Sequence, residues 1–377
     1  MNLQMNDLQS QYKRLKKEMD AAIQEVINSA SFINGPQVNV FCDHLAAYLN
    51  SPFVIPCGNG TDAIRLALQA LNTQPGDEII IPAFTYIAAA EMVASLGLIP
   101  VLVDVDAETF HINTELLVQA ITRQTKAIIV VHLFGQACEM EAVMKIAEKY
   151  KISVIEDNAQ SLGVDYTFAD GTVKKAGTIG HIGTTSFFPT KPLGCYGDGG
   201  AVLTSNAQLA ERIRMIANHG QTEKYHHKTV GCNSRLDTIQ AAILDVKLKY
   251  MDDFSRIRQK AARYYDQTLS AISEIRIPAK SLFSSHIYHQ YTIRVKNGQR
   301  NALQAYLKQQ GIPSTVYYPL SVQEQEGYKW VARVSGDVKV ASNLCKEVLS
   351  LPIHTEMTDE MLQYITSNVV NFFRNKS

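Results

Sequence analysis

The chain has 377 residues, of which 46% are hydrophobic, and its 36 basic residues balance its 36 acidic ones. This length allows a large core divided into about two domains, and the even charge argues against a nucleic-acid-binding surface. The six cysteines are scattered and form no CxxC motif, which favours free thiols in a reducing compartment over disulfides or a zinc site. We find no signal-peptide pattern and no membrane-spanning pattern, so we expect a cytoplasmic protein. We also expect that it binds no metal ion.

In chain order, the pattern predicts helices over residues 7–50 and then an alternation of strands and helices. The predicted strands are short apolar runs at residues 53–56, 78–81, 100–105, 126–133, 152–155, 185–188 and 201–204. The helical patterns between them lie at residues 61–71, 86–96, 114–121, 140–150 and 207–217. About seven buried strands alternating with helices predict an α/β fold with a mostly parallel sheet covered on both faces.

After residue 236 the pattern changes to that of a smaller α+β domain. It predicts a long helix, a strand, a helix, a second strand and two final helices, at residues 238–270, 289–295, 301–310, 314–318, 338–349 and 358–375. We therefore expect a large domain over residues 1–245 and a small C-terminal domain over residues 246–377.

The most unusual residue is Lys191, within the stretch SFFPTKPLGCYGDGGA. Pro192 favours an extended backbone at the lysine, and the glycines that follow permit a sharp turn. An amine held among aromatic and apolar groups loses solvation, which lowers its pKa and makes it a better nucleophile and base. Taken alone, the stretch is equally typical of a solvated lysine in a glycine-rich hairpin.

Polar groups also follow several of the predicted strands, at the sheet edge where open α/β proteins bind ligands. The run GNGTDA, which contains Gly60, Thr61 and Asp62, places a helix N-terminus directly after a strand and so predicts a phosphate cradle. The same run matches the G-x-G-x-x-A motif of dinucleotide-binding proteins, but the acidic residue that this motif needs after the next strand is missing. A plain tight turn is a further alternative.

Together these residues meet the requirements of pyridoxal 5′-phosphate. This cofactor needs an amine, a carboxylate for its pyridinium nitrogen, a flat partner for its ring and a phosphate anchor. Lys191, Asp157, Tyr86 and the GNGTDA turn would supply them. Each has an ordinary alternative, since a lone aspartate often caps a helix and a tyrosine is often half-buried.

Five motifs resemble the DegT/DnrJ/StrS family of sugar aminotransferases, and the resemblance covers nearly the whole chain. They are GNGTDAIRLAL, PAFTYIAAAE, EDNAQSLG, SFFPTKPLGCYGDGGA and GCNSRLDTIQAAIL. The resemblance implies the aspartate-aminotransferase (type I) fold, with Lys191 linked covalently to the cofactor, Asp157 on the pyridinium nitrogen and Tyr86 stacked on the ring. It also implies further cofactor contacts from Gln160 near the ring hydroxyl and, at the phosphate, from Gly60, Thr61, the Asp62 backbone and Ser186.

The family further implies a homodimer with shared active sites, because Asn233 would reach the phosphate from the partner subunit. The chain looks closest to the branch that acts on UDP-2-acetamido-3-keto-glucuronate in O-antigen biosynthesis, with L-glutamate as the amino donor. Arg235 would bind an anionic part of the sugar nucleotide or form an ordinary interface ion pair. Tyr317 and Tyr318 would lie near the substrate, and Tyr317 stands where the family commonly has histidine, which leaves the sugar open.

Three other functions stay open at this stage. The first is an aminotransferase for a dTDP-3-keto- or 4-keto-6-deoxyhexose. The second is a sugar dehydratase of the same family, although its members replace the lysine with histidine and this chain keeps Lys191. The third is a catalytically silent, cofactor-binding regulator, which would usually carry an appended DNA-binding domain.

Overall fold

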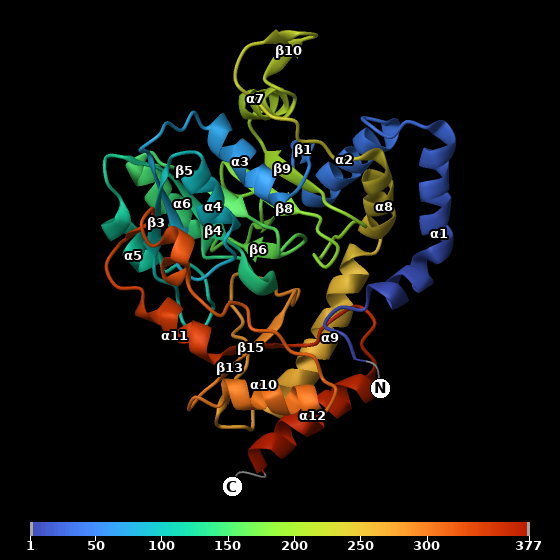
Figure 1. Cartoon of the computed structure of the whole chain (residues 1–377), viewed down its shortest axis with the longest axis vertical. Coiled ribbons are helices and arrows are strands. Elements are labelled where there is room, and N and C mark those ends of the chain that lie inside the picture. The colour runs from blue at the N-terminus through green and yellow to red at the C-terminus, as the bar shows by residue number, and fades with distance from the viewer. Residues whose placement is uncertain (1–2, 375–377) are drawn as a thin grey trace.

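The computed structural model describes residues 3–374, and its central feature is a sheet of eight strands with helices around it (Figure 1). The strand order is β1-β9-β8-β5-β4-β2-β3-β14, and all neighbours are parallel except β1 with β9 and β8 with β9. Its strands are β1 (Phe53–Cys57), β2 (Glu78–Pro82), β3 (Ile99–Val103), β4 (Thr125–Val131), β5 (Ser153–Asp157), β8 (Ile182–Ser186), β9 (Gly200–Thr204) and β14 (Arg333–Val334).

Helices cover both faces of this sheet, as the unbroken apolar strands require. Alternate residues of β2 face opposite ways: Ile79 and Ile81 pack with α3, α4, α7 and α11, whereas Ile80 packs with α5 and α6. The bounds are α3 (Gly60–Ala70), α4 (Ala88–Ser95), α5 (Thr114–Ala120), α6 (Met140–Tyr150), α7 (Ala207–Ala217) and α11 (Lys339–Glu347). The predicted α/β fold with a mostly parallel sheet is confirmed.

The predicted number of seven strands was too low. All seven predicted strands are present, and β14 adds an eighth, parallel to β3. Its Arg333 holds the carboxylate of Glu78, the first residue of β2, with two nitrogen–oxygen contacts of 3.0 Å. A strand of two residues has no periodicity that a sequence pattern can reveal.

The two N-terminal helices, α1 (Leu8–Ser29) and α2 (Pro36–Leu49), pack against α8 (Thr238–Leu248) beside the sheet. Asp7 caps α1 by accepting the N–H of Ser10 over 2.9 Å, and Pro36 opens α2 at a position where its missing N–H has no cost. The shared core of these three helices includes Met19, Phe41 and Leu244.

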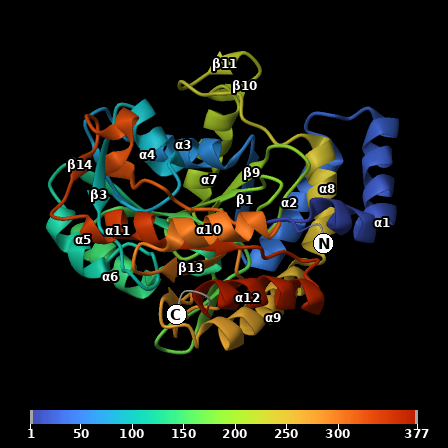
Figure 2. The ribbon, with the colours of Figure 1, turned by 60° about the horizontal axis from the view of Figure 1, so that its bottom comes forward.

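The C-terminal part forms a three-stranded antiparallel sheet, β12-β13-β15, packed with α9, α10 and α12. Figure 2 shows α12 running alongside α9. The bounds are α9 (Met251–Leu269), β12 (Ile275–Arg276), β13 (Tyr291–Val295), α10 (Arg300–Gln309), β15 (Val348–Leu351) and α12 (Asp359–Arg374). The remaining short elements are β6 (Asp165–Thr167), β7 (Val173–Lys175), β10 (Gln221–Glu223), β11 (His226–His227), η1 (Leu133–Gly135), η2 (Val322–Glu324) and η3 (Glu326–Tyr328).

Two predicted elements of this part were wrong. The single helix expected over residues 238–270 is divided into α8 and α9, because the first belongs to the core of the N-terminal helices and the second continues into the core of the small sheet. Residues 314–318 do not form a strand and make one isolated bridge, Thr315 to Ser350. The predicted last residue of the final helix, at position 375, lies outside the described residues. Within residues 3–374, every helix is too short or too polar to cross a lipid bilayer.

Candidate active site

Lys191 lies in the turn between β8 and β9, at the sheet edge that the sequence predicts. Its side chain is partly buried, and the loss of water around the amine lowers its pKa, while the charge of Asp157 acts in the opposite direction. The turn needs glycine after the lysine, since a Cβ on Gly194 would lie 2.3 Å from the carbonyl oxygen of Pro189. The turn thus holds a lysine amine in a desolvated place with one acidic neighbour.

That neighbour, Asp157, is the last residue of β5, the strand that pairs with β8. Burial raises the pKa of its carboxyl, while the hydrogen bond from the Ala159 N–H (3.0 Å) and the charge of Lys191 act in the opposite direction. The ends of two adjacent parallel strands therefore bring an amine and a carboxylate together.

A second carboxylate, which sequence analysis missed, lies directly before Asp157 and is fully buried. Glu156 accepts hydrogen bonds from His132 Nε2 (2.8 Å) and from the backbone N–H groups of Gly177 and Ile179 (2.8 and 2.7 Å). Burial alone would raise the pKa of Glu156, but these bonds hold it below its usual range. His132 Nδ1 accepts the N–H of Cys138, so its Nε2 carries the proton given to Glu156.

This Glu156–His132 pair fixes the framework of the site. It joins the end of β5 to the segment that leads into β8, and the backbone N–H of His132 also donates to the carbonyl of Asp157. The sequence feature that could have indicated this pair is the two adjacent acidic residues, Glu156 and Asp157, at the end of a strand. Successive strand residues point to opposite faces, so two such acids need separate partners.

The predicted phosphate cradle lies at the N-terminus of α3. Asn59 caps the helix by accepting the N–H of Asp62 over 2.8 Å. Gly60 packs so closely on the end of β8 that a Cβ there would lie 2.6 Å from the Cβ of Ser186. The structure therefore places Gly60, Thr61, Asp62 and Ser186 together, at a helix end whose dipole favours an anion.

Aromatic side chains form another wall of the site. The ring of Tyr86 is 55% exposed, and its centre lies 6.2 Å from that of Tyr318. Gln160 donates through Nε2 to the Tyr318 hydroxyl (3.0 Å) and accepts the N–H of Phe134 (2.9 Å). The half-buried Tyr317 lies beside Tyr318, with 5.9 Å between ring centres. Three of the predicted residues, Tyr86, Gln160 and Tyr318, thus form one connected group.

Asn233 and Arg235 stand apart from this group. The intervening Ser234 does reach the cradle, since its hydroxyl donates to Asp62 (2.6 Å) and accepts the N–H of Gly58 (2.9 Å). Among residues 3–374, however, no hydrogen bond joins the side chain of Asn233 or Arg235 to the cradle, and Asn233 is exposed. Just before them, the β10–β11 hairpin projects away from the body of the chain, at the top of Figure 1.

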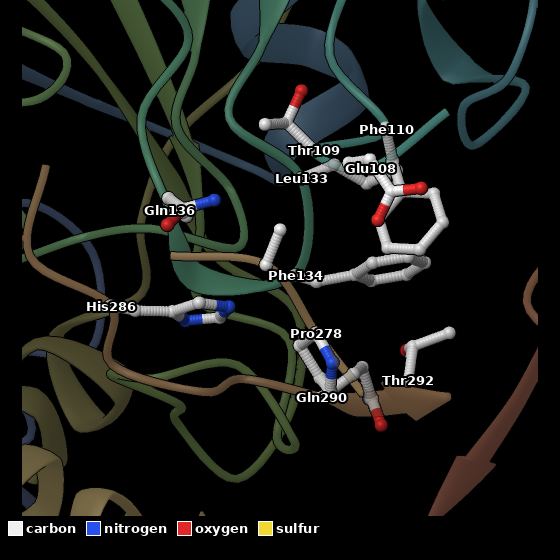
Figure 3. A pocket seen from close by; sticks show the side chains of 11 residues that line it. Glu108, Thr109, Phe110, Leu133, Phe134, Gln136, Pro278, His286, Gln290 and Thr292 are labelled. Carbon is white, nitrogen blue, oxygen red and sulfur yellow. The ribbon is translucent and has the colours of Figure 1, made fainter. Parts of the chain in front are cut away.

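A small enclosed cavity lies between the end of β4 and the C-terminal part. Figure 3 shows Phe110, Phe134, His286 and Gln290 among the side chains that line it. Its volume of about 10 Å³ has room for about one water molecule and not for a cofactor. In the part of the chain that the structure describes, no group of three His, Cys, Asp or Glu side chains is placed to hold a metal ion.

Comparison with known proteins identifies the family of the chain that carries this site. The model of the DegT/DnrJ/EryC1/StrS aminotransferase family matches residues 13–370. The chain belongs to this family. Its type I aminotransferase fold and its membership, both expected from the five motifs, are confirmed.

Individual members of this sugar aminotransferase family match the chain over almost their whole length. A "pleiotropic regulatory protein" of Geobacillus stearothermophilus is 43% identical, over 99% of both chains. The UDP-2-acetamido-2-deoxy-3-oxo-D-glucuronate aminotransferase of Pseudomonas aeruginosa is also 43% identical, over 97% of this chain and 99% of its own. The solved structure of DesV from S. venezuelae, in complex with a ketimine intermediate, is 34% identical and superposes with a TM-score of 0.94 over 98% of both chains.

The protein is therefore an aminotransferase that depends on pyridoxal phosphate. Its own residues fit that cofactor. The cradle at Gly60 has no room for a side chain, Asp157 is a partly buried carboxylate near a cation, and Lys191 is a partly buried amine. When bound, the cofactor supplies an electron sink for the charge that develops on the substrate carbon.

Proposed function

We propose that this protein transfers an amino group from L-glutamate to C3 of UDP-2-acetamido-3-keto-glucuronate, in the biosynthesis of a surface polysaccharide such as O-antigen or lipopolysaccharide. The chemistry rests on one observation above all: the partly buried, desolvated Lys191 amine near Asp157, beyond the ends of two adjacent strands. The choice of sugar is supported by the relative from Pseudomonas aeruginosa, which has that substrate in its name.

In this proposal Lys191 and Asp157 are the catalytic residues. Lys191 holds the cofactor between turnovers, and its Nζ then takes a proton from the donor carbon and later returns one to the sugar carbon. Burial lowers the pKa of this amine, which increases the fraction that is neutral and able to accept the proton. The Asp157 carboxylate would accept the pyridinium N–H of the bound cofactor, which would then supply an effective electron sink.

The other proposed contacts bind and orient. Tyr86 would stack on the cofactor ring, and Gln160 would contact it on the side of the ring hydroxyl. The phosphate is held at the α3 N-terminus by Gly60, Thr61, the Asp62 backbone and the Ser186 hydroxyl. Tyr317, Tyr318 and Arg235 contact the nucleotide sugar, with the Arg235 guanidinium on an anionic group.

We further propose a cytoplasmic homodimer in which Asn233 completes the phosphate site of the partner subunit. The support is that Asn233 is exposed in its own chain and follows a projecting hairpin. Two of the most exposed apolar side chains lie in this segment, Tyr225 at 80% and Val230 at 85%, as expected of a surface that a second subunit covers.

The substrate proposal is tested with the purified holoenzyme and L-glutamate against a panel of UDP- and dTDP-linked keto-sugars. We expect the highest kcat/KM with UDP-2-acetamido-3-keto-glucuronate, measured by 2-oxoglutarate release. A clear preference for a dTDP-3-keto- or 4-keto-6-deoxyhexose would overturn the choice of sugar. Replacement of L-glutamate by another amino acid as the best donor would overturn the choice of donor.

A regulatory role is the second candidate, because the relative from Geobacillus stearothermophilus is named a regulator. The two candidates separate in a deletion strain complemented with Lys191→Ala. If the strain's phenotype depends on amination, this variant will fail to restore it. Full restoration by Lys191→Ala would favour a regulator that needs no catalysis.

A further inference from the structure

An unpaired cation is buried at the junction of two cores, on α9. Arg258 is only 5% exposed. Four residues earlier on α9, Phe254 packs in the core of the N-terminal helices, whereas Ala261 and Ala262 pack in the core of the small sheet. Residues three and four apart share one helix face, so the Arg258 side chain enters the interior where these cores meet.

Within residues 3–374, the guanidinium of Arg258 makes no hydrogen bond and no ion pair, and of its three nitrogens the Nε is fully buried without a partner. Burial is the one cause that lowers its pKa, to about 10, and no acidic group offsets it. Taking an unpaired charge out of water is costly, so natural proteins rarely do so without a partner.

Arginines with a structural role in this chain have hydrogen-bond or ion-pair partners. Arg333 holds Glu78 with two contacts, and Arg300 donates to the carbonyls of Cys345 and Val348. Arg65 and Arg212 also have an unpaired Nε, but both side chains are partly exposed and reach water. Arg258 differs from all of these because it is both buried and unpaired.

A second buried group without a partner, His289, lies in a segment that contacts α9 beside Arg258, since Gln259 donates to the carbonyl of His286 over 3.0 Å. It is 4% exposed, and its Nδ1 has no hydrogen-bond partner. The segment before it is pinned to η1, since Ile287 donates to the carbonyl of Gly135 over 2.8 Å. Burial lowers the pKa of the His289 imidazole, and the charges of Lys191 and Arg258 lower it further. The segment that carries His289 therefore contacts both α9 beside Arg258 and η1 at the active site, and the charges of Lys191 and Arg258 both act on its imidazole.

We infer that Arg258 and His289 form a subsite for a carboxylate of the substrate that reacts at Lys191. A guanidinium offers two parallel N–H donors that match the two oxygens of a carboxylate, and an imidazole N–H adds a third. The anion would supply the partner that Arg258 lacks. This inference rests on the proposed function, which offers two sources of carboxylate: the amino acid donor and the uronate group of the keto-sugar.

The test separates the two half-reactions of the holoenzyme, each followed by the absorbance of the cofactor. The variants are Arg258→Met, which keeps the length of the side chain and removes the charge, and Arg258→Lys, which keeps the charge. The matched control is Arg256→Met, on the same helix, where the side chain is exposed and pairs with Asp253 at the surface.

If the donor carboxylate binds here, Arg258→Met raises the L-glutamate concentration for half-maximal rate by about 10- to 100-fold, as expected for lost bonds to a charged group. Arg258→Lys recovers part of this loss, and the keto-sugar half-reaction stays within about twofold. If the sugar carboxylate binds here, the pattern is reversed, and a UDP-3-keto-sugar without a carboxylate is unaffected by the mutation. Either pattern supports the subsite and identifies which of the two carboxylates it binds.

A binding measurement keeps this test independent of the proposed reaction. Glutarate, which has no amino group to react, should bind the wild-type holoenzyme and the Arg256→Met control in a calorimeter, and should not bind Arg258→Met. The subsite is overturned if both half-reactions and glutarate binding match the control. Should Arg258→Met not fold, Arg258→Lys and His289→Phe take its place, and unchanged behaviour of both variants overturns the subsite.

Failure of the proposed function looks different from failure of the subsite. A wild-type enzyme that aminates no keto-sugar yet binds glutarate through Arg258 retains the subsite and loses the proposed substrate. An enzyme that aminates the sugar while Arg258→Met behaves like wild type loses the subsite alone.

Discussion

The side-chain amide of Gln160 donates a 3.0 Å hydrogen bond to the hydroxyl of Tyr318, across 158 positions of sequence. Gln160 follows β5, three residues after Asp157, whereas Tyr318 belongs to the C-terminal half of the chain. The bond thus connects the sheet edge that carries the lysine and the carboxylate with the aromatic wall opposite. The site is therefore built from both halves of the chain, and substitutions in either half can test it.

Replacing Lys191 with alanine should leave a folded protein that binds the cofactor without a covalent link. Borohydride reduction of the wild-type enzyme, followed by peptide mapping, should place the pyridoxyl group on Lys191. The same treatment of Lys191→Ala should leave the cofactor removable by dialysis. Finding the modified group on another lysine would contradict the assignment.

Asp157→Asn should slow turnover by on the order of a hundredfold or more, because an amide cannot hold the pyridinium proton. Folding should be retained, as the amide oxygen can still accept the N–H of Ala159. The matched control is Asp170→Asn, at an exposed position where the carboxylate accepts the N–H of Thr172. Equal kcat values for the two variants would mean that Asp157 has a different role.

Gly60→Ala should sharply reduce cofactor affinity, since the new Cβ would lie 2.6 Å from the Cβ of Ser186 and force the cradle apart. Gly327→Ala is the control, because a Cβ there meets nothing within 4 Å. Cofactor release during equilibrium dialysis measures the difference. Similar affinity in both variants would exclude the α3 N-terminus as the phosphate site.

Mixing subunits tests the proposed dimer. Lys191→Ala on one chain and Asn233→Ala with Arg235→Ala on the other should each be inactive alone. If the loop serves the partner, the mixed dimer has one site with an intact lysine and an intact loop, and recovers up to half of the wild-type activity. The two chains are co-expressed with different tags, and the mixed dimer is isolated and assayed. A mixed dimer no more active than its parents would assign each site to one chain.

Acid should destabilise the fold from about pH 6.5 downward. Burial lowers the pKa of His286 to about 3, helped by the charges of His111 and Lys280, whereas the unfolded residue titrates near 6.5. Between these values the unfolded chain binds one more proton than the folded one, so stability falls as pH falls, by about 1.4 kcal/mol per pH unit for this group.

His286→Asn keeps an acceptor near the Nδ1 position, which receives the N–H of Tyr288, and should make this fall less steep. Urea unfolding at several values between pH 7 and pH 5 gives the slope. The exposed His227 provides the control, as His227→Asn should leave the slope unchanged. An unaltered slope in His286→Asn would show that other groups cause the acid sensitivity.

The sequence was sufficient for the sheet and for the residues at its edge, because both depend on local pattern. Runs such as 127–131 are apolar throughout and are typical of buried strands, and the glycines around Lys191 mark a turn. The polar groups of the site then follow from where those strands end. Asp157 was found in this way, without knowledge of its neighbours.

The contacts that depend on distant segments could not be predicted. The partners of Glu156 are His132 and backbone N–H groups of residues 177–180, which no spacing rule connects. Arg258 reads as one of several charged residues on an amphipathic helix, and only the packing of α9 between two cores shows that it is buried. Residues 314–318 carry a strand-like pattern, but Tyr318 packs against Phe84 and Tyr86 instead.

The pairing of β14 with β3 affects whether an incomplete chain exposes an open sheet edge. Without residues 333–334, the outer N–H and C=O groups of β3 would form an open sheet edge, which is prone to pair with other chains. During synthesis the large sheet stays incomplete until residue 334 has left the ribosome, long after its other seven strands. A fragment ending near residue 245 would contain every strand of the large sheet except β14, which closes this edge, and we expect it to aggregate. The last part of the chain therefore protects the sheet as well as contributing side chains to the site.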